Sequence, residues 1–139
     1  MKILFFAFMA LVQTQAATQV TPGCDEQSFF QIEGKKIEFC WLPKVEAWVS
    51  IQCVQKKQPA CKALALHQSL LKQVAVLESE ELDGGKNPGS VLCGKIGGTL
   101  QYAILEGGSQ QTFCSAADGS LIDSNALGNA YYTGEKNKK

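Results

Sequence analysis

Residues 28–41, SFFQIEGKKIEFCW, determine how the first half of the chain folds. Apolar and polar residues alternate on both sides of a central glycine, which is the pattern of two half-buried strands. Gly34 suits the first position of a two-residue type II′ turn, so we predict a hairpin in which Ile32 pairs with Ile37. The core face should carry Phe30, Ile32, Ile37, Phe39 and Trp41, and the solvent face Gln31, Glu33, Lys36, Glu38 and Cys40.

Two further elements are predicted in the first half. Residues 45–54 alternate again, which indicates a third strand. From residue 60 the apolar residues recur with the period of a helix, which should end near residue 78 and cover the apolar face of the hairpin. The stripe of that helix consists of Ala60, Ala63, Leu64, Leu70, Leu71 and Val74.

The second half contains a clear helix start. Asn87 suits the capping position and Pro88 the first turn, and the glycine pair at 97–98 should stop the helix after residue 96. Strands at 99–106 and 109–115 should form a second hairpin. A short strand is expected at 120–123, and Ser124 should cap a last helix that reaches residue 132.

These elements predict an α+β protein of antiparallel hairpins, each packed against a helix and joined by disulfides. The predicted organisation is a signal peptide at 1–16, an N-terminal unit at 17–78, a linker at 79–86, a C-terminal unit at 87–134 and a polar tail at 135–139.

The first residues resemble a cleaved leader. Lys2 precedes an apolar run at 3–12 and small residues at 13–17, as in secretory signal peptides. The run is too short for a membrane-spanning helix, which needs about 20 apolar residues. We therefore expect an exported protein, located in the periplasm or outside the cell.

All six cysteines follow this leader, and an even number in an exported chain indicates disulfides. No pair has the close spacing of a zinc site. A bridge between Cys93 and Cys114 would join the predicted helix to the second hairpin, and a bridge between Cys53 and Cys61 would join strand to helix. Cys24 would then pair with Cys40 by elimination, although the two do not lie opposite each other in the predicted register.

No residue pattern indicates a catalytic or metal site. His67, the only histidine, lies at the centre of the predicted helix stripe. It is either a general base or pH sensor, or a residue in or beside the core, and the second interpretation is favoured. The glycines at 94–98 follow a helix rather than a strand, so they do not form a phosphate loop. We expect no enzyme activity, no metal and no cofactor.

The charges do not indicate a nucleic-acid partner. The chain has 13 basic and 13 acidic residues, and every basic residue is a lysine. A protein without a basic excess or arginine lacks the usual electrostatic signature of DNA or RNA binding.

One segment resembles a known family. The residues that carry the resemblance are Asn87, Pro88, Gly89, Ser90, Cys93, Gly97, Gly98, Cys114, Asp118, Gly119 and Ser120. Their order is similar to that of small exported bacterial domains of unknown function that often carry the label haemolysin, over residues 86–132. That family commonly has Ala where Gly89 stands and Pro where Ala117 stands.

We therefore expect a non-catalytic binding or inhibitory module of the cell envelope, with an unidentified protein or envelope component as partner. The aromatic residues that could contact it are Trp48, Tyr102, Tyr131 and Tyr132, since aromatic side chains are enriched at interfaces. For each of them, however, a place partly in the core is the favoured interpretation. The alternatives are a membrane-active haemolysin-like protein, although no stable membrane insertion is expected, and a structural envelope protein.

Replacing Cys93 or Cys114 by Ser should lower the melting temperature more than replacing His67. The predicted bridge closes a loop of about 22 residues, which contributes roughly 3 kcal/mol by restricting the unfolded chain. Calorimetry of the three variants, kept under oxidising conditions, measures the difference. Equal melting temperatures would contradict the bridge.

Overall fold

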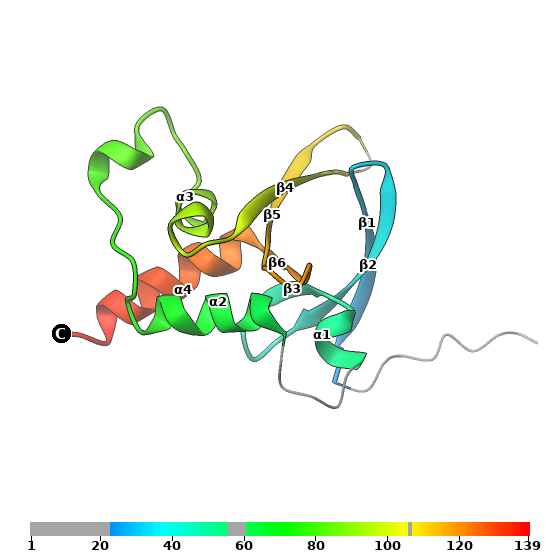
Figure 1. The fold of residues 1–139 in the computed structure, drawn as a ribbon, viewed down its shortest axis with the longest axis horizontal. Coiled ribbons are helices and arrows are strands. Elements are labelled where there is room, and N and C mark those ends of the chain that lie inside the picture. The colour runs from blue at the N-terminus through cyan, green and yellow to red at the C-terminus, as the bar shows by residue number, and fades with distance from the viewer. Residues whose placement is uncertain (1–22, 56–60, 106) are drawn as a thin grey trace, which may run out of the picture.

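Six strands from both halves of the chain form one closed antiparallel barrel, with helices packed beside it (Figure 1). The computed structural model describes residues 23–55, 61–105 and 107–139, so the expected signal peptide at 1–16 lies outside the described residues. The strands are β1 (Glu26–Ile32), β2 (Lys35–Leu42), β3 (Ala47–Ser50), β4 (Thr99–Ile104), β5 (Gln110–Ser115) and β6 (Leu121–Asp123). The helices are α1 (Gln52–Gln55), α2 (Lys62–Leu71), the 3₁₀ helix η1 (Ser79–Leu82), α3 (Pro88–Lys95) and α4 (Ser124–Lys136). The predicted α+β class is confirmed.

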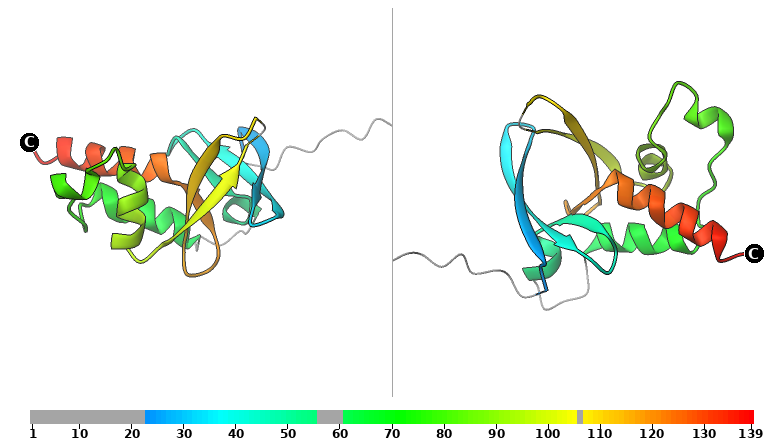
Figure 2. Two further views of the ribbon diagram at one scale, coloured as in Figure 1. Left: turned by 90° about the horizontal axis from the view of Figure 1, so that it is seen from above. Right: turned by 180° about the vertical axis from the view of Figure 1, so that it is seen from behind.

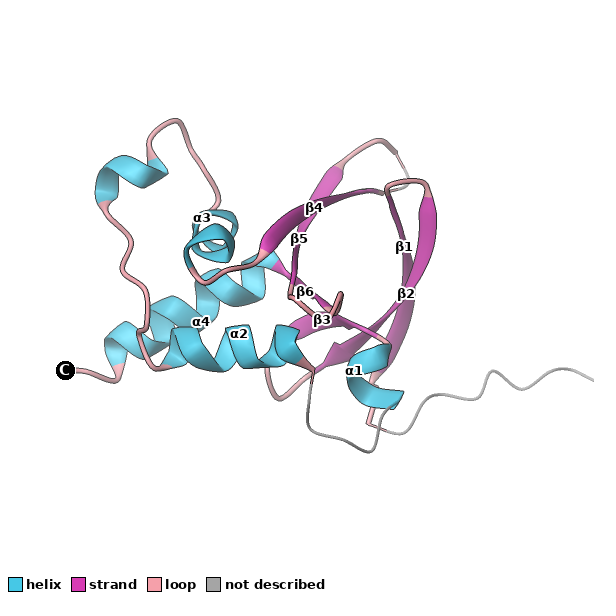
Figure 3. Ribbon diagram, in the orientation of Figure 1, coloured by secondary structure: helices cyan, strands magenta, loops and turns pink. Residues whose placement is uncertain are grey.

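The barrel joins the two halves of the chain at two short contacts. The strand order is β1-β2-β3-β6-β5-β4, and Figures 2 and 3 show the ring that these strands make. β3 pairs with β6 through Val49 and Ile122 alone, and β1 pairs with β4 at two positions. The predicted units at 17–78 and 87–134 thus share one sheet, and part of the predicted linker at 79–86 forms η1.

The β1–β2 hairpin has the predicted faces but a different register. Phe30, rather than Ile32, pairs with Ile37. The turn residues Glu33 and Gly34 both have positive φ, at 50° and 75°, as in a type I′ turn and not the predicted type II′. Because the register differs by two residues, the same side chains remain on the core face.

Cys40 is buried, although it was predicted on the solvent face. The residues just before β1 lie beside the end of β2, where the backbone N–H of Asp25 donates to the carbonyl of Trp41 (3.2 Å). Cys24, in the same segment, is bonded to Cys40. Cys40 also pairs with Val49 on β3, and it belongs with Val49 and Ile122 to a second hydrophobic cluster that includes residues of α2 and α4, which explains its burial.

An aromatic cluster fills the barrel. The ring centroids of Phe39 and Phe113 lie 4.5 Å apart, and the ring of Phe30 lies 5.1 Å from each of them. Aromatic pairs at these distances add about 0.5–1.5 kcal/mol beyond the burial of their surface. The hairpin of the first half and β5 of the second half therefore share one hydrophobic core.

The helix α2 is shorter than predicted and packs elsewhere. It ends at Leu71 rather than near residue 78, and Gln73 has a positive φ of 59°. The β-branched residues Val74 and Val76 follow, and these are weak helix formers. α2 packs against α4 and not on the hairpin as predicted, because the apolar face of the hairpin is already enclosed by the barrel.

The helices of the second half begin with side-chain caps. Asn87 Oδ1 accepts the N–H of Ser90 (3.1 Å) at the start of α3, as predicted. α4 is capped by Asp123 and not by Ser124, and Asp123 Oδ1 accepts the N–H of Ala126 (2.9 Å). α4 extends to Lys136, so it includes part of the predicted tail.

Three disulfides join the elements, in the pairs that the sequence favoured. They are Cys24–Cys40, Cys53–Cys61 and Cys93–Cys114, with Cα–Cα distances of 5.4, 4.9 and 5.7 Å. The last bridge fixes α3 to β5. A Cβ atom on Gly98 would lie 2.3 Å from Cys114 Sγ, so a glycine is needed beside this bridge.

The backbones of α3 and α4 lie in close contact at Gly89. A Cβ atom on Gly89 would lie 1.6 Å from the carbonyl oxygen of Ser124, so Gly89 allows the two backbones to approach. Gly94 lies on the same helix in open space, since a Cβ atom there would meet nothing within 4 Å outside its own helix and chain neighbours.

Gly89→Ala should therefore lower the free energy of unfolding by roughly 3 kcal/mol, although Ala is the better helix former. Gly94→Ala is the matched control and should raise it by up to about 1 kcal/mol. Urea denaturation of both variants measures the difference. Equal effects of the two substitutions would contradict the close contact.

Candidate interaction surface

The four aromatic residues predicted as contacts lie in different environments. Trp48 is half-buried, with its ring 5.8 Å from that of Phe30 in the barrel core. Tyr131 is buried, and its hydroxyl accepts the N–H of Leu77 (3.2 Å). Tyr102 on β4 and Tyr132 on α4 are exposed, by 53% and 40%. The structure therefore presents two of the four on the surface, and it does not bring the four together.

Tyr102 belongs to an exposed apolar area where β1 meets β4. This area, termed the seam surface, comprises Phe29, Gln31, Lys36, Tyr102, Ile104 and Gln110. Phe29 and Ile104 are 55% and 59% exposed. With Tyr102, they make up three of the six large hydrophobic side chains that are exposed in the described part of the chain. Exposed apolar groups that gather in this way often mark interaction sites.

Two hollows flank the pairing of β1 with β4. One, of about 610 Å³, is lined by Phe29 and Lys36, and the other, of about 540 Å³, by Tyr102. Both hollows reach Gln31 and Ile104. They flank a short pairing, because β1 and β4 pair at two positions only. The seam surface thus has a hollow on each side of the short pairing between β1 and β4.

The side chains of the seam surface favour a mixed apolar and polar contact. Lys36 Nζ lies 4.3 Å from the centroid of the Phe29 ring, a cation–π contact that orients the ring. Gln31, Gln101 and Gln110 line the second hollow. Each of these amides can donate and accept hydrogen bonds. The surface could therefore bind through its apolar rings while the amides pair with polar groups of a partner.

Phe29 and Ile104 were not among the predicted contacts. Each directly adjoins a core-facing residue, Phe30 or Ala103, on a strand. Because neighbours on a strand face opposite ways, only one residue of each apolar pair can point into the barrel. In the sequence, each of the two is an apolar residue at a position that the strand alternation assigns to the outer face.

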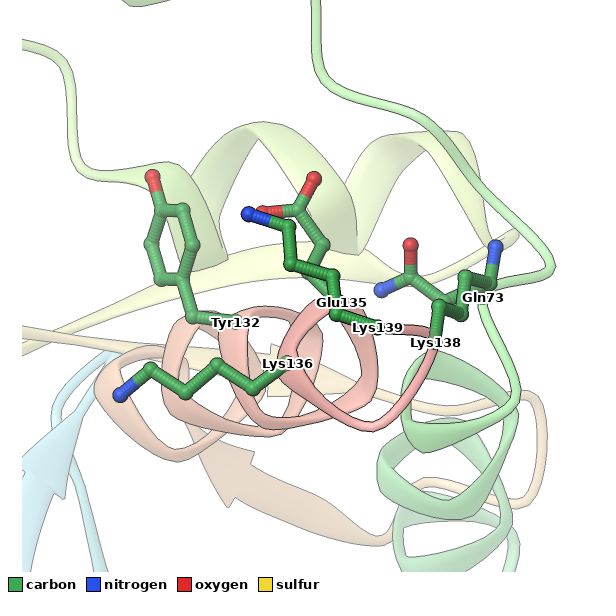
Figure 4. A pocket seen from close by; sticks show the side chains of 6 residues that line it. All are labelled: Gln73, Tyr132, Glu135, Lys136, Lys138 and Lys139. Atoms are coloured by element: carbon green, nitrogen blue, oxygen red, sulfur yellow. The ribbon is translucent and has the colours of Figure 1, made fainter.

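A third hollow, of about 550 Å³, lies at the end of α4 around Tyr132 (Figure 4). Figure 4 shows the Tyr132 ring and the Glu135 side chain projecting from α4, with Gln73 contributed by the chain beyond α2. Its other lining residues are Lys136, Lys138 and Lys139. These exposed charges of both signs each contribute little to affinity, so this hollow is a weaker candidate than the seam surface.

The buried polar side chains serve the fold. Asp123 Oδ2 accepts the N–H of Trp48 (2.7 Å), in addition to the cap at Ala126. Burial raises the pKa of Asp123 above its ordinary value. His67 is buried on α2, and burial lowers its pKa. Its Nδ1 atom has no hydrogen-bond partner among the described residues.

The Asp118, Gly119 and Ser120 motif holds the start of α2. Asp118 Oδ2 accepts the N–H of Lys62 (3.1 Å), and Ser120 Oγ accepts the N–H of Ala63 (2.9 Å). Burial acts to raise the pKa of Asp118, but hydrogen bonds from Ser120 and Lys62 outweigh it and the pKa lies below its ordinary value. The motif therefore caps a helix of the other half of the chain.

Neither a metal-binding cluster nor a membrane-spanning helix occurs in the described ranges 23–55, 61–105 and 107–139. No group of three or more His, Cys, Asp or Glu side chains there is placed to hold a metal ion. None of the helices in these ranges combines the length and the apolar character that crossing a membrane requires.

Comparison with known proteins identifies one segment of the chain. A family model described as a domain of unknown function (DUF333) matches residues 84–130, about a third of the 139 residues. This segment contains α3, β4, β5, β6 and the start of α4. No curated protein and no solved structure matches the chain. The comparisons thus support a domain of unknown function in the segment that carries the sequence motifs.

His67 should make stability depend on pH. Its pKa is about 6.5 in the unfolded chain and lower in the folded one, so between these two values the unfolded chain binds more protons. The free energy of unfolding should therefore fall as the pH is lowered through 6.5 toward the folded pKa.

Urea denaturation at a series of pH values around 6.5 should show this loss in the wild type. His67→Leu should be less sensitive over the same range, because Leu cannot take up a proton. Identical pH profiles for the two proteins would contradict the effect of burial on His67.

Proposed function

We propose that this protein is an exported, non-catalytic binding or inhibitory module of the cell envelope that contacts its partner through the seam surface. The observation that carries the proposal is the gathering of Phe29, Tyr102 and Ile104 between two hollows on the outside of the barrel. Aromatic residues at the centre of a patch are common anchors of protein contacts.

Export is supported by the cysteines and the leader pattern. Three disulfides are typical of proteins that fold in oxidising compartments. The signal-peptide pattern at 1–16 agrees with that environment.

A rigid scaffold also favours binding. The seam surface lies on strands of a closed barrel whose interior is filled by packed aromatic rings. Side chains held on such a frame lose little conformational entropy when a partner docks. The same rigidity suits an inhibitor, which must occupy a partner's surface without rearranging.

The arrangement of titratable groups supports a non-catalytic role. Both oxygens of Asp123 accept backbone N–H groups, and His67 is buried. A general acid or base must reach the substrate within hydrogen-bond distance, and neither group is exposed to do so.

Affinity capture from periplasm or culture medium, with the purified oxidised protein as bait, tests the proposal. Tyr102→Ser combined with Ile104→Ser should weaken the capture of a specific partner about tenfold or more, because anchor residues contribute most of the binding energy. The affinity for the recovered partner is then measured by calorimetry.

Tyr132→Ser is the matched control, because it removes an exposed tyrosine from α4, away from the seam surface. It should leave the affinity within twofold of the wild type. Melting temperatures establish that all variants are folded. Recovery of no partner, or equal loss in both variants, would contradict the proposal.

A further inference from the structure

The closure of the barrel leaves part of β4 without a neighbouring strand on one side. In the described part of the chain, the pairing with β1 uses Ala103 and Ile104 of β4. β1 then ends, because the turn at 33–34 leads the chain into β2. Figure 3 shows that β1 and β4 meet near the ends of their hairpins. Residues 99–102 of β4, which we name the β4 edge, extend beyond this contact.

The backbone of the β4 edge points away from β5 at alternate residues. The N–H of Leu105 donates to the carbonyl of Ser109 (2.8 Å), so these two residues continue the β4–β5 register as a hydrogen-bonded pair. Bonded and non-bonded pairs alternate along an antiparallel ladder. Leu100 and Tyr102 therefore direct their N–H and C=O groups to the other side, where β1 would lie if it continued.

These backbone groups are open to a partner. No hydrogen bond is found among the described residues for the backbone of Leu100 or for the N–H of Tyr102. Thr99 and Tyr102 are exposed, and Leu100 and Gln101 are half-buried. The hollow of about 540 Å³ lies beside them, since Leu100, Gln101 and Tyr102 line it. The β4 edge thus offers unpaired donors and acceptors next to a space that a ligand can enter.

The sequence of β4 lacks the features that usually protect an exposed strand edge. Such edges commonly carry charged residues or proline, which prevent pairing with another chain. β4 reads TLQYAI, with no charged residue and no proline, and its Thr, Tyr and Ile favour extended structure. β2, which is paired on both sides, contains three charged residues in KKIEFCWL. Charged residues are therefore present in this barrel but absent from the strand whose edge is open.

We propose that the β4 edge takes up an extended segment of a protein partner as an added strand. The proposal rests on the function proposed for the seam surface, to which Tyr102 belongs, and it specifies the kind of segment that binds there. Strand addition is a common mode of peptide recognition, in which main-chain hydrogen bonds supply affinity and the side chains supply specificity.

The neighbouring side chains define the composition of the segment. Ala103 is buried in the barrel, so Tyr102 and Leu100 lie on the outer face by alternation. Apolar residues of the segment would contact them across the strands. Glu33 is the charged residue among those that line the hollow, so a basic residue at one end of the segment would pair with it. The partner segment is therefore extended, alternately apolar, and basic at one end.

Hydrogen bonding distinguishes an added strand from a docked helix. A helix bonds its backbone groups internally and would leave those of the β4 edge to water. A strand pairs with them directly, and the four residues of the edge span about 13 Å. A segment of about four to six residues covers that length.

A synthetic peptide tests the proposal. The probe is a fluorescent peptide of about eight residues, in which valine and threonine alternate and a lysine stands at one end. Its fluorescence anisotropy is measured against the purified, oxidised full chain. The matched control has the same side chains but an N-methyl group on each internal residue, which removes the N–H donors. The plain peptide should bind at least tenfold more tightly than the methylated one, because only the plain peptide can pair with the edge.

Two substitutions at one position locate the binding site. Tyr102→Ala and Tyr102→Pro both remove the ring, but only proline also removes the N–H that points toward the added strand. Proline is tolerated on an edge strand where this group faces outward, so the pairing with β5 should persist. Tyr102→Pro should bind the plain peptide at least tenfold more weakly than Tyr102→Ala. Melting temperatures establish that both variants are folded.

Equal affinities for the plain and the methylated peptide would overturn the proposal, as would equal affinities of the two variants. If Tyr102→Pro does not fold, the pair of peptides decides the question. Self-association of the purified chain that Tyr102→Pro abolishes, without binding of the peptide, would assign the β4 edge to a second copy of the chain instead.

The capture experiment separates this proposal from the function proposed above. Loss of the captured partner in the variant Tyr102→Ser with Ile104→Ser, together with equal binding of the two peptides, would keep the seam surface as a binding site and overturn strand addition alone. Binding of the plain peptide without any partner in periplasm or culture medium would contradict the proposed function and support the β4 edge as a strand acceptor.

Discussion

The carboxylate of Asp123 is the interaction on which the arrangement of the two halves depends. One oxygen accepts the N–H of Ala126 and starts α4, while the other accepts the N–H of Trp48 on β3. β3 and β6 share only the pair Val49 and Ile122, so this side chain reinforces the point where the barrel passes from one half to the other. The carboxylate is buried, and the pKa rises because burial disfavours its charge. Two charge-assisted hydrogen bonds offset that cost and set the direction in which α4 leaves the sheet.

The segment that matches the domain of unknown function uses its motifs to bind the rest of the chain. Asp118 and Ser120 cap α2, which lies outside the matched residues 84–130. β4 and β6, inside the match, complete the barrel by pairing with β1 and β3. Gly89 acts within the segment, where it lets α3 approach α4. Without the rest of the chain, the matched segment would expose the edges of β4 and β6 and the polar groups that hold α2. The N-terminal half therefore completes the barrel that the matched segment begins.

Local patterns in the sequence predicted more of the fold than of the surface. Alternation placed Phe30, Ile32 and Phe39 in the core, and Asn87 with Pro88 marked the start of α3, because these signals depend on neighbouring residues. Closure of the barrel could not be predicted, since it joins residues more than 70 positions apart through one pair between β3 and β6 and two pairs between β1 and β4. The same long-range closure enclosed the hairpin face and left α2 to pack on α4. Tyr102 is exposed and Tyr131 is buried, and nothing in their sequence spacing distinguishes these two environments.

The groups with shifted pKa values and the exposed apolar groups have different roles in this structure. Three of the polar side chains with shifted pKa values, Asp123, His67 and Asp118, lie where they hold or pack elements of the fold. Three of the exposed apolar side chains, Phe29, Tyr102 and Ile104, instead collect on the seam surface of the barrel, beside Lys36. Because the exposed seam residues point outward from the barrel, a substitution there should leave the buried contacts of Asp123 and His67 intact.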